Sequence, residues 1–271
     1  TPTSTGSLGL PKGTTAQQPT ASATEGHIRY DTDDDVVYYS NGTNWLKISS
    51  AVPNLTSVSG NIINGIVTNL TLAGTNFLAS NLVVSFTPSG GSASTVTVTP
   101  SSTTAATVAV PAAIYGQSAS TVIAIKVTNS DGVESSSVNS TVLSAPTGGS
   151  ISNAGGYRIH TFNSSANFVV PSGLTLSNVE YLIIAGGGGA NFGGTSGQSG
   201  GGAGAGGYRS SVTGENSGGG ANAESKMTLS AGTYGAVVGA GGAGQAAATV
   251  APNGSNSTFN SITSLGGGGS A

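Results

Sequence analysis

The sequence predicts an all-β protein built from three consecutive units, and three observations lead to this prediction. Only 6% of the residues are charged, against about 25% in a typical soluble domain, so long helices joined by salt bridges are not expected. Short runs rich in valine and threonine alternate apolar with polar residues, which is the period of half-buried strands. Clusters of glycine, serine, asparagine and proline separate these runs, as turns do.

Two shifts in composition divide the chain into units at 1–51, 52–146 and 147–271. Of the 17 charged residues, eight lie in the first unit, three in the second and six in the third. Glycine is distributed differently, with 12 of the 45 before residue 147 and 33 after it. Pro53 and Pro146 lie beside the two boundaries, where linkers often carry proline.

The first unit opens with a segment rich in threonine, serine, glycine and proline that has no periodicity. We expect this segment to be extended and either to pack on something else or to be loose. Strands are predicted at 26–30, 36–39 and 45–48, with Asn41-Gly42 as a hairpin turn. Such a three-stranded meander is too small to bury a core alone, since chains below about 40 residues usually need help.

Three motifs of the first unit occur in a fixed order, namely Leu8-Gly-Leu-Pro-Lys-Gly-Thr-Thr-Ala16, Gly26-x-x-Arg-Tyr and Tyr39-Ser-Asn-Gly-Thr-Asn-Trp45. Together they resemble a small module of phage virion proteins, found in tail fibres and other appendages of marine and cyanobacterial phages. The resemblance covers nearly all of residues 8–49. It implies that residues 1–51 dock onto other virion proteins.

The second unit shows five alternating runs, at 66–72, 82–86, 95–99, 106–110 and 122–127. A span of this length with about seven such strands fits a β-sandwich. Its segments Leu72-Ala-Gly-Thr-Asn-Phe77, Val108-Ala-Val-Pro111 and Val127-Thr-Asn-Ser-Asp-Gly-Val133 resemble the IPT/TIG immunoglobulin-like family. That resemblance implies an Ig-like domain that serves as a spacer or a binding module.

The third unit repeats one pattern three times, an apolar strand that runs into glycine. Two ordinary strands are predicted first, at 157–162 and 168–171. The repeated pattern then occurs at 179–184 before 185–189, at 234–238 before 239–244, and at 261–265 before 266–269. We interpret it as a loose internal repeat.

The glycine runs admit two interpretations. They could be flexible linkers, or they could be polyproline-II strands that bond to one another, because only glycine lets backbones approach so closely. We favour the packed form, since strands, Tyr208-Arg209 and Phe259 punctuate the runs. Over most of 155–271 the unit also resembles the glycine-rich domains of phage tail-fibre proteins and adhesins, which implies host-surface recognition. Because such domains usually continue past a glycine run like the one before Ala271, a further receptor-binding tip stays an open alternative.

Two motifs suggest binding chemistry and are interpreted otherwise. Residues 202–207 match the dinucleotide pattern GxGxxG by chance within a glycine tract, since no helical period follows. The aspartates Asp31, Asp33, Asp34 and Asp35 could ligate calcium. No glutamate follows at the loop spacing, however, so we favour a solvated hairpin turn.

The remaining candidates also have structural explanations. His27 and His160 lie in different units, whereas zinc needs three or four ligands, so structural or surface roles are expected. An enzyme acting on glycans would need paired carboxylates, and Glu180, Glu215 and Glu224 are in no convincing setting. The chain has no cysteine, which excludes thiolate chemistry. No catalytic, cofactor-binding or metal-binding residue is therefore predicted.

Composition also limits the partners. A nucleic-acid reader needs a basic face, which a net charge of −3 does not supply, and no apolar run approaches the roughly 20 residues of a membrane helix. Tyr38, Tyr39 and Trp45 are expected in the core of the meander and in its contact with a neighbouring chain.

The functional prediction is a non-enzymatic structural segment of a tail fibre or capsid fibre on the surface of a phage particle. It would be a homotrimer that supports attachment to a host-surface glycan or protein. Phe192, Tyr208 and Arg209 are predicted to make that contact. A bacterial cell-surface adhesin or extracellular matrix protein is the main alternative, and a decoration protein on the phage head is another.

Overall fold

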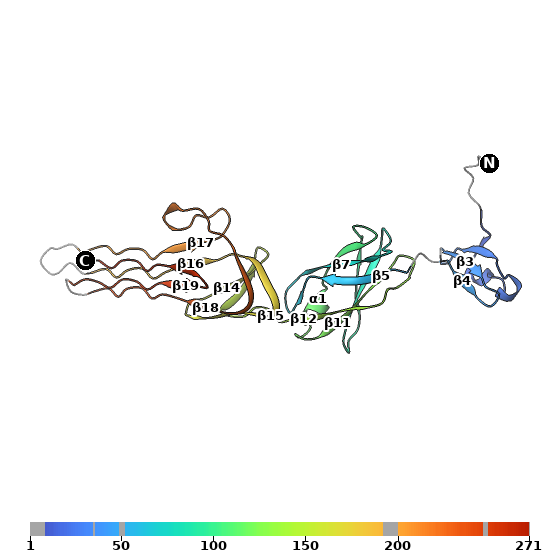
Figure 1. Cartoon of the computed structure of the whole chain (residues 1–271), viewed down its shortest axis with the longest axis horizontal. Helices are drawn as coiled ribbons and strands as arrows, with labels where there is room; N and C mark the ends of the chain where they lie inside the picture. Colours follow the sequence, from blue (N-terminus) through green and yellow to red (C-terminus); the bar gives the residue numbers. More distant parts are fainter. Residues whose placement is uncertain (1–8, 35, 49–51, 192–199, 246–248, 271) are drawn as a thin grey trace, which may run out of the picture. The chain divides into compact units, whose positions relative to one another are not determined.

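A computed structural model describes residues 9–34, 36–48, 52–191, 200–245 and 249–270, and nearly all of its regular elements are strands (Figure 1). The chain divides into two compact units, Thr1–Val142 and Leu143–Ala271. These are called the first and second units from here on, so the second unit of the structure corresponds to the third unit predicted from the sequence. The predicted all-β class is confirmed.

The first sheet contains the three predicted meander strands and one short strand that precedes them. Its order is β1-β2-β3-β4, with β1 parallel to β2 and the other pairs antiparallel. The strands are β1 (Lys12–Gly13), β2 (Ile28–Asp31), β3 (Val36–Ser40) and β4 (Trp45–Lys47). Between β1 and β2, the turns η1 (Thr15–Gln17) and η2 (Ala21–Ala23) lie across one face of the sheet.

Residues 54–143 form a β-sandwich, because alternate side chains of its strands turn inward. One sheet has the order β10-β7-β5 and the other β6-β12-β11-β8-β9. The strands are β5 (Asn54–Ser59), β6 (Ile62–Ile63), β7 (Asn69–Thr75), β8 (Leu82–Pro88), β9 (Ser94–Val98), β10 (Ala105–Ala109), β11 (Val122–Thr128) and β12 (Val138–Leu143). The short helix α1 (Ala112–Tyr115) places Ile114 in the same hydrophobic core as Phe86 and Phe77.

Two of the segments that resemble the Ig-like family meet in space. The buried Asn129 amide accepts a bond from the Leu78 N–H at 3.1 Å and donates to the Asn76 carbonyl at 2.8 Å. Asn76 has a φ of 60°, a left-handed conformation that asparagine adopts more readily than most residues. Both motifs are thus parts of one corner that closes the sandwich.

The second unit contains a hairpin, a four-stranded sheet and a two-stranded sheet. The hairpin is β13-β14, the larger sheet has the order β15-β18-β19-β20, and β16 pairs with β17. The strands are β13 (Ser150–Ala154), β14 (Tyr157–Thr161), β15 (Ala166–Val179), β16 (Leu182–Ile184), β17 (Tyr208–Ser210), β18 (Met227–Val237), β19 (Ser257–Phe259) and β20 (Ile262–Ser264). The long β15–β18 ladder is interrupted by two register shifts.

A small core holds this unit together where the hairpin meets the larger sheet. The His160 ring stands edge-on to Phe168 at a centroid distance of 4.9 Å, and Phe259 lies 6.0 Å from Phe168. His160 Nδ1 is also 2.8 Å from the Gly148 carbonyl. The histidine therefore has the structural role expected of it.

Candidate functional site

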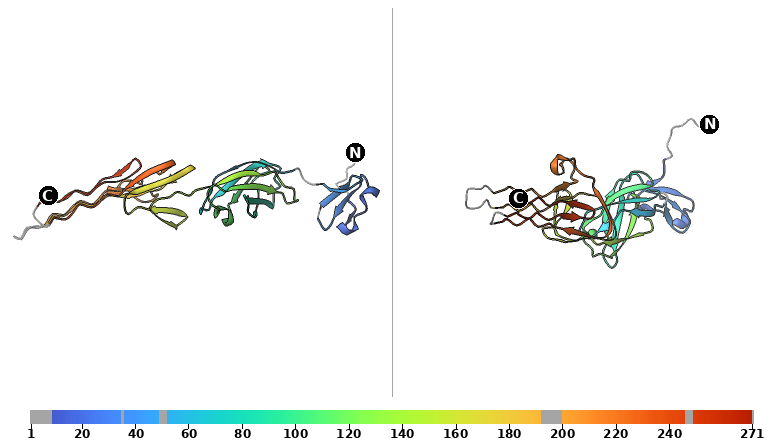
Figure 2. Two further views of the ribbon diagram at one scale, coloured as in Figure 1. Left: turned by 90° about the horizontal axis from the view of Figure 1, so that it is seen from below. Right: turned by 60° about the vertical axis from the view of Figure 1, so that its left-hand side comes forward.

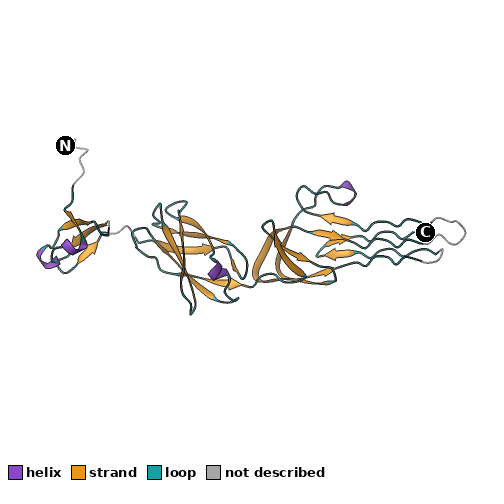
Figure 3. Ribbon diagram, turned by 180° about the vertical axis from the view of Figure 1, so that it is seen from behind, coloured by secondary structure: helices purple, strands orange, loops and turns teal. Residues whose placement is uncertain are grey.

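The glycine runs pack side by side as five extended segments, drawn without strand arrows in Figure 3 and still together in the two views of Figure 2. Each segment continues into or out of a strand of the second unit. The segments are 185–191, 200–207, 239–245, 251–256 and 265–270. We call this assembly the glycine bundle.

Backbone hydrogen bonds in the glycine bundle recur at every third residue. Gly186 and Gly189 donate to the carbonyl oxygens of Ser255 and Pro252, at 3.1 and 2.9 Å. The same step of three relates the bonded pairs Ala185–Gly207 with Gly188–Gly204, Gly204–Gly268 with Gly207–Leu265, Gly242–Gly187 with Gln245–Ala190, and Gly267–Gly186 with Ser270–Gly189. Three residues per turn is the repeat of polyproline II, which has no bonds of its own and must find partners outside. The packed interpretation of the runs therefore describes this structure.

Segment 185–191 is the centre of the glycine bundle, because it bonds to all four other segments. An α-helix or a β-strand satisfies its backbone in one or two directions, whereas a threefold helix presents its N–H and C=O groups in three. A central segment can therefore be surrounded on all sides without leaving polar backbone groups unpaired.

Several glycines of the bundle have no room for a side chain. A Cβ added to Gly188 would lie 2.0 Å from the Gly268 carbonyl oxygen, and Gly186, Gly254 and Gly266 meet neighbouring carbonyls as closely. The hydrogen that glycine carries there instead points at the carbonyl, in the manner of a Cα–H···O contact. By contrast, a Cβ added to Gly268 would meet nothing within 4 Å. The bundle thus requires glycine at its inner positions and not at its outer ones.

A partly buried polar cluster fixes loop 211–226 to the strands at the base of the glycine bundle. Arg209 binds the Glu224 carboxylate through Nε and through Nη2, the latter at 2.7 Å, and its Nη1 donates to the Thr263 carbonyl at 3.0 Å. The hydroxyls of Tyr181 and Ser217 donate to the same carboxylate at 2.8 and 3.0 Å. Four donor atoms of three residues from separate segments, Tyr181, Arg209 and Ser217, therefore converge on Glu224.

The protonation states in this cluster follow from those contacts. The hydrogen bond from Arg209 lowers the pKa of Glu224 to about 2, against the opposing effect of burial and with further help from Tyr181 and Ser217. Burial, together with the hydrogen bond to Glu224, raises the pKa of Tyr181 to about 12. The cluster is thus a fixed ion pair with a neutral phenol, an arrangement that holds a loop in place.

Of the three residues predicted to touch a host, two lie in this region. Tyr208 and Arg209 belong to β17, and the Tyr208 hydroxyl is 3.4 Å from the Glu215 carboxylate. Arg209 is engaged by Glu224, so its role within the chain is structural. Phe192 lies outside the described residues. A host contact at these positions stays a prediction.

Polar side chains bind the backbone at the other end of the bundle. Asn191 N–H donates to the Ser270 hydroxyl at 2.7 Å, and the Asn191 carbonyl oxygen of the side chain accepts from Gly201 N–H at 2.7 Å. Asn253 similarly accepts from the Gly269 N–H at 2.8 Å. These contacts order the ends of the described segments.

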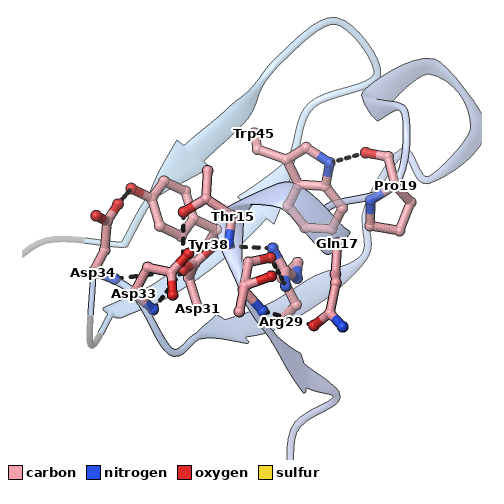
Figure 4. Close-up of polar contacts among 10 residues, drawn as sticks. Thr15, Gln17, Pro19, Arg29, Asp31, Asp33, Asp34, Tyr38 and Trp45 are labelled. Carbon is pink, nitrogen blue, oxygen red and sulfur yellow. Dashed lines mark hydrogen bonds and ion pairs between the residues drawn. The ribbon is translucent and has the colours of Figure 1, made fainter.

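Among the described aspartates of the first sheet, Asp33 and Asp34 lie in an exposed turn as predicted, whereas Asp31 does not. Asp31 is buried on β2, where it pairs with Arg29 at 3.0 Å and accepts the Thr15 hydroxyl at 3.1 Å (Figure 4). Its Oδ1 also accepts the backbone N–H groups of Asp33 and Asp34, at 3.0 and 3.4 Å. The turn prediction was therefore wrong for Asp31, which organises the turn from within the fold.

The solvated-turn prediction failed at Asp31 because Arg29 and Asp31, two residues apart on β2, lie on the same face of the sheet and form a buried ion pair. Burial by itself would raise the pKa of Asp31, but the backbone bonds from Asp33 and Asp34, with Thr15 and Arg29, hold it below its ordinary value. Asp35 lies outside the described residues.

The predicted aromatic residues of the meander fall on both faces of its sheet. Trp45 donates through Nε1 to the Pro19 carbonyl at 2.7 Å, and the Tyr38 hydroxyl donates to Asp34 (Figure 4). Tyr39 lies on the opposite face, with Ile28 and Leu46 as its cross-strand neighbours.

The other candidate residues have the following surroundings. Glu180 pairs with Lys226 at 2.6 Å, and residues 204–207 of the GxGxxG match are part of the glycine bundle. His27 is exposed on the first sheet. Among the residues that the structure describes, no group of three or more His, Cys, Asp or Glu side chains could hold a metal ion, and no helix is long and apolar enough to cross a membrane.

Sequence reasoning did not find Glu224 as the partner of Arg209 or Asp31 as the partner of Arg29. The second pair had a signal, since residues two apart on a strand share a face and opposite charges there can pair. The first pair had none, because 14 residues separate its members.

Comparison with known proteins agrees with the glycine-rich character of the second unit. Residues 160–271 match the profile of a family described as "Glycine-rich domain". Among solved structures, the crystal structure of chicken CNTN1 FN1-FN3 domains is similar to 84% of this chain and 70% of its own, with 17% identity and a TM-score of 0.24. No curated protein sequence matches the chain.

Proposed function

We propose that the chain is a structural segment of a fibre on a phage particle, either a tail fibre or a capsid fibre, which supports attachment to the host surface. The observation that carries the proposal is the glycine bundle, in which five segments are joined by hydrogen bonds at every third residue. A bundle of this kind is a rigid support for a binding surface, and a rigid support limits the entropy that is lost on binding.

The three parts of the chain have separate roles in this proposal. Residues 1–51 dock onto other virion proteins, the Ig-like sandwich is a spacer, and the glycine-rich unit faces the host. Its partner is a glycan or protein of the host surface, contacted by residues around Phe192, Tyr208 and Arg209. The chain acts as a homotrimer at the virion surface, without a cofactor, a bound nucleic acid or catalysis.

Two ion pairs in the described part of the second unit support a structural role rather than catalysis. Arg209 and Lys226 neutralise Glu224 and Glu180 within the chain. A glycosidase needs one carboxyl group with a raised pKa as its acid, whereas the pKa of Glu224 is lowered to about 2. Glycan release by the purified chain would contradict this part of the proposal.

The location of the chain tests the proposal most directly. Antibodies raised against the purified chain would be used for immunogold electron microscopy on particles and on cells from the source culture. We expect gold on fibres of phage particles. Labelling of the bacterial envelope in cultures free of phage would replace the proposal with the alternative, a cell-surface adhesin or matrix protein.

A further inference from the structure

A small pocket lies at one end of the first sheet. It has a volume of about 190 Å³, and its lining comes from β1, from the segment that joins β1 to β2, from the start of β2 and from Trp45 of β4. Sites for drug-sized ligands usually enclose about 300–1,000 Å³. The pocket therefore has room for a single small ring rather than for a long ligand.

One wall of the pocket is an indole ring held in a fixed orientation. Trp45 is half-buried, and its Nε1 donates to the Pro19 carbonyl at 2.7 Å (Figure 4). Pro19 and Pro11 extend this apolar wall. The face of an aromatic ring is electron-rich and attracts C–H groups. Because the ring is already tied down, a ligand that stacks on it pays little to order it.

The other lining residues carry polar atoms with unused bonding capacity. Gln17 Oε1 accepts the Thr14 N–H at 2.9 Å, while Gln17 Nε2 donates to no residue in the described part of the chain. The exposed His27 ring likewise has no hydrogen bond to a described residue. Arg29 donates from Nη1 to Asp31 and from Nη2 to the Thr14 carbonyl, which uses two of its five N–H groups.

The glycine at position 13 keeps space open beside these polar atoms. A Cβ added to Gly13 would lie 2.9 Å from Gln17 Oε1 and 3.0 Å from Arg29 Nη2. The φ of Gly13 is not positive, so its backbone conformation does not require glycine. The space next to Gln17 and Arg29 is what a larger residue would remove.

The charges around the pocket limit what it can accept. Arg29 is neutralised by Asp31 at 3.0 Å. No aspartate or glutamate lines the pocket, and Lys12 is the other basic residue of its lining. A neutral ring or a ring with one negative charge is therefore compatible with these walls, whereas a cation is not.

We propose that this pocket binds one pyranose ring of a glycan. A pyranose has a face of C–H groups that suits the Trp45 indole, and its hydroxyls both donate and accept, as Gln17, His27 and Arg29 require. The carboxylate of an acidic peptide would leave the indole wall unfilled. A proline ring would fill that wall and leave the polar atoms unpaired.

The proposal goes beyond the proposed function and does not depend on it. The host contact proposed above involves Phe192, Tyr208 and Arg209 in the second unit, whereas this pocket belongs to the first sheet. It gives the chain a sugar site of its own, whatever the particle or cell on which the chain is found.

Fluorescence of the full chain tests the proposal, because Trp45 is the sole tryptophan. The probes are the methyl glycosides of glucose, galactose, mannose, N-acetylglucosamine and glucuronic acid. We expect at least one to change the Trp45 emission in a saturable way, with a Kd of about 1 mM, as for other ligands of this size. A lower Kd for the glucuronide than for the glucoside would assign acidic sugars to the pocket, and equal values would assign neutral ones.

Variants of the lining locate the bound sugar. Gln17→Ala and His27→Ala should each raise the Kd about five- to tenfold, since each removes one hydrogen-bonding group. The matched control is Gln18→Ala, because Gln18 neighbours Gln17 and does not line the pocket, and it should leave the Kd unchanged. An unaltered emission spectrum without sugar shows that a variant still folds.

Saturation-transfer NMR on the unaltered chain keeps the proposal falsifiable if the variants fail to fold. The C–H protons on one face of the sugar should receive saturation from the protein, together with the change in Trp45 emission. Saturation transfer without that change would place the sugar elsewhere and overturn the proposal. So would equal affinities of folded Gln17→Ala and Gln18→Ala, or no saturable change with any of the glycosides up to about 50 mM. None of these results depends on where the chain lies on a particle, so the pocket and the fibre function can fail separately.

Discussion

An alanine at Gly188 should break the glycine bundle, although it adds only one methyl group. The added Cβ would lie 2.0 Å from the Gly268 carbonyl oxygen, and this gap must widen by about 1 Å to reach the ordinary limit of such contacts. The Gly268 carbonyl accepts the Gly204 N–H at 2.7 Å, and the Gly204 carbonyl accepts the Gly188 N–H at 2.9 Å. A shift of that size therefore removes both hydrogen bonds.

The expected cost follows from these two bonds. Each contributes about 1 kcal/mol, with a larger cost where a buried group stays unpaired, and overpacking by itself costs about 1–3 kcal/mol. We expect Gly188→Ala to lose about 2–4 kcal/mol. For a unit of this size that corresponds to a fall in Tm of about 8–16 °C.

The matched control is Gly268→Ala, because Gly268 carries the carbonyl oxygen that the new Cβ at position 188 would meet. Its Cβ would meet nothing within 4 Å and its φ is not positive, so the substitution should stabilise slightly, by about 0.4–1 kcal/mol. Calorimetry of the full chain measures both variants on the transition of the second unit. Equal melting of Gly188→Ala and Gly268→Ala would refute the packed bundle.

Three further predictions concern the polar clusters and the sandwich core. Glu224 has a folded pKa of about 2 against an ordinary value of 4.5, so its stabilising effect is complete above pH 4.5 and is lost as the pH falls toward 2. The Tm of Glu224→Gln should be lower at pH 7 and should vary less with pH across this window than the Tm of the unaltered chain. A Tm profile for Glu224→Gln that varies with pH as the unaltered chain does would contradict the assignment. Asp31→Asn leaves the buried Arg29 without its counterion, so the first sheet should unfold first, seen as a red shift of Trp45 emission below the main melting transition; emission identical to that of the unaltered chain would disprove the structural role. Phe86→Ala should lose about 3–5 kcal/mol in the sandwich, measured by urea unfolding, and a loss below 1 kcal/mol would show that the core is not packed as described.

The sandwich was predictable because its strands obey a period of two. The run that begins at Leu82 alternates buried and partly exposed residues through Pro88, and each such strand can be located from its own residues. The two-residue strand β6 and the helix α1 were not predicted, since neither is long enough to show a period. Their positions depend on the core around Ile114, which only the assembled sheets define.

The three meander strands of the first sheet were predicted, but which face of the sheet is buried was not. Alternation places Ile28 and Tyr30 on one face and Arg29 and Asp31 on the other, but it does not say which face is buried. The ordinary expectation buries the apolar set. The structure reverses it because the segment from Thr14 supplies polar partners to Arg29 and Asp31.

Packing of the glycine runs was predictable from the sequence, but the number of segments in the glycine bundle was not. Glycine composition marks the runs at 185–189, 239–244 and 266–269, yet residues 251–256 contain a single glycine and form one of the five segments. Pro252 suits an extended conformation, which is a weak signal. Backbone hydrogen bonds that recur at every third residue impose no side-chain pattern on a glycine-rich sequence, so this period cannot be read from the residues.

Residue-resolved amide exchange tests the central claim most directly, namely that the glycine runs form a hydrogen-bonded scaffold. The N–H groups of Gly186, Gly189 and Gly204 are bonded in the bundle and should exchange at least about 100-fold more slowly than free amides, the factor that corresponds to a local opening free energy of about 2.8 kcal/mol. The exposed Gly202 and Gly268, whose N–H groups donate to no residue in the described part of the chain, should exchange rapidly. Exchange of all five amides at the rate of a free linker would contradict the account.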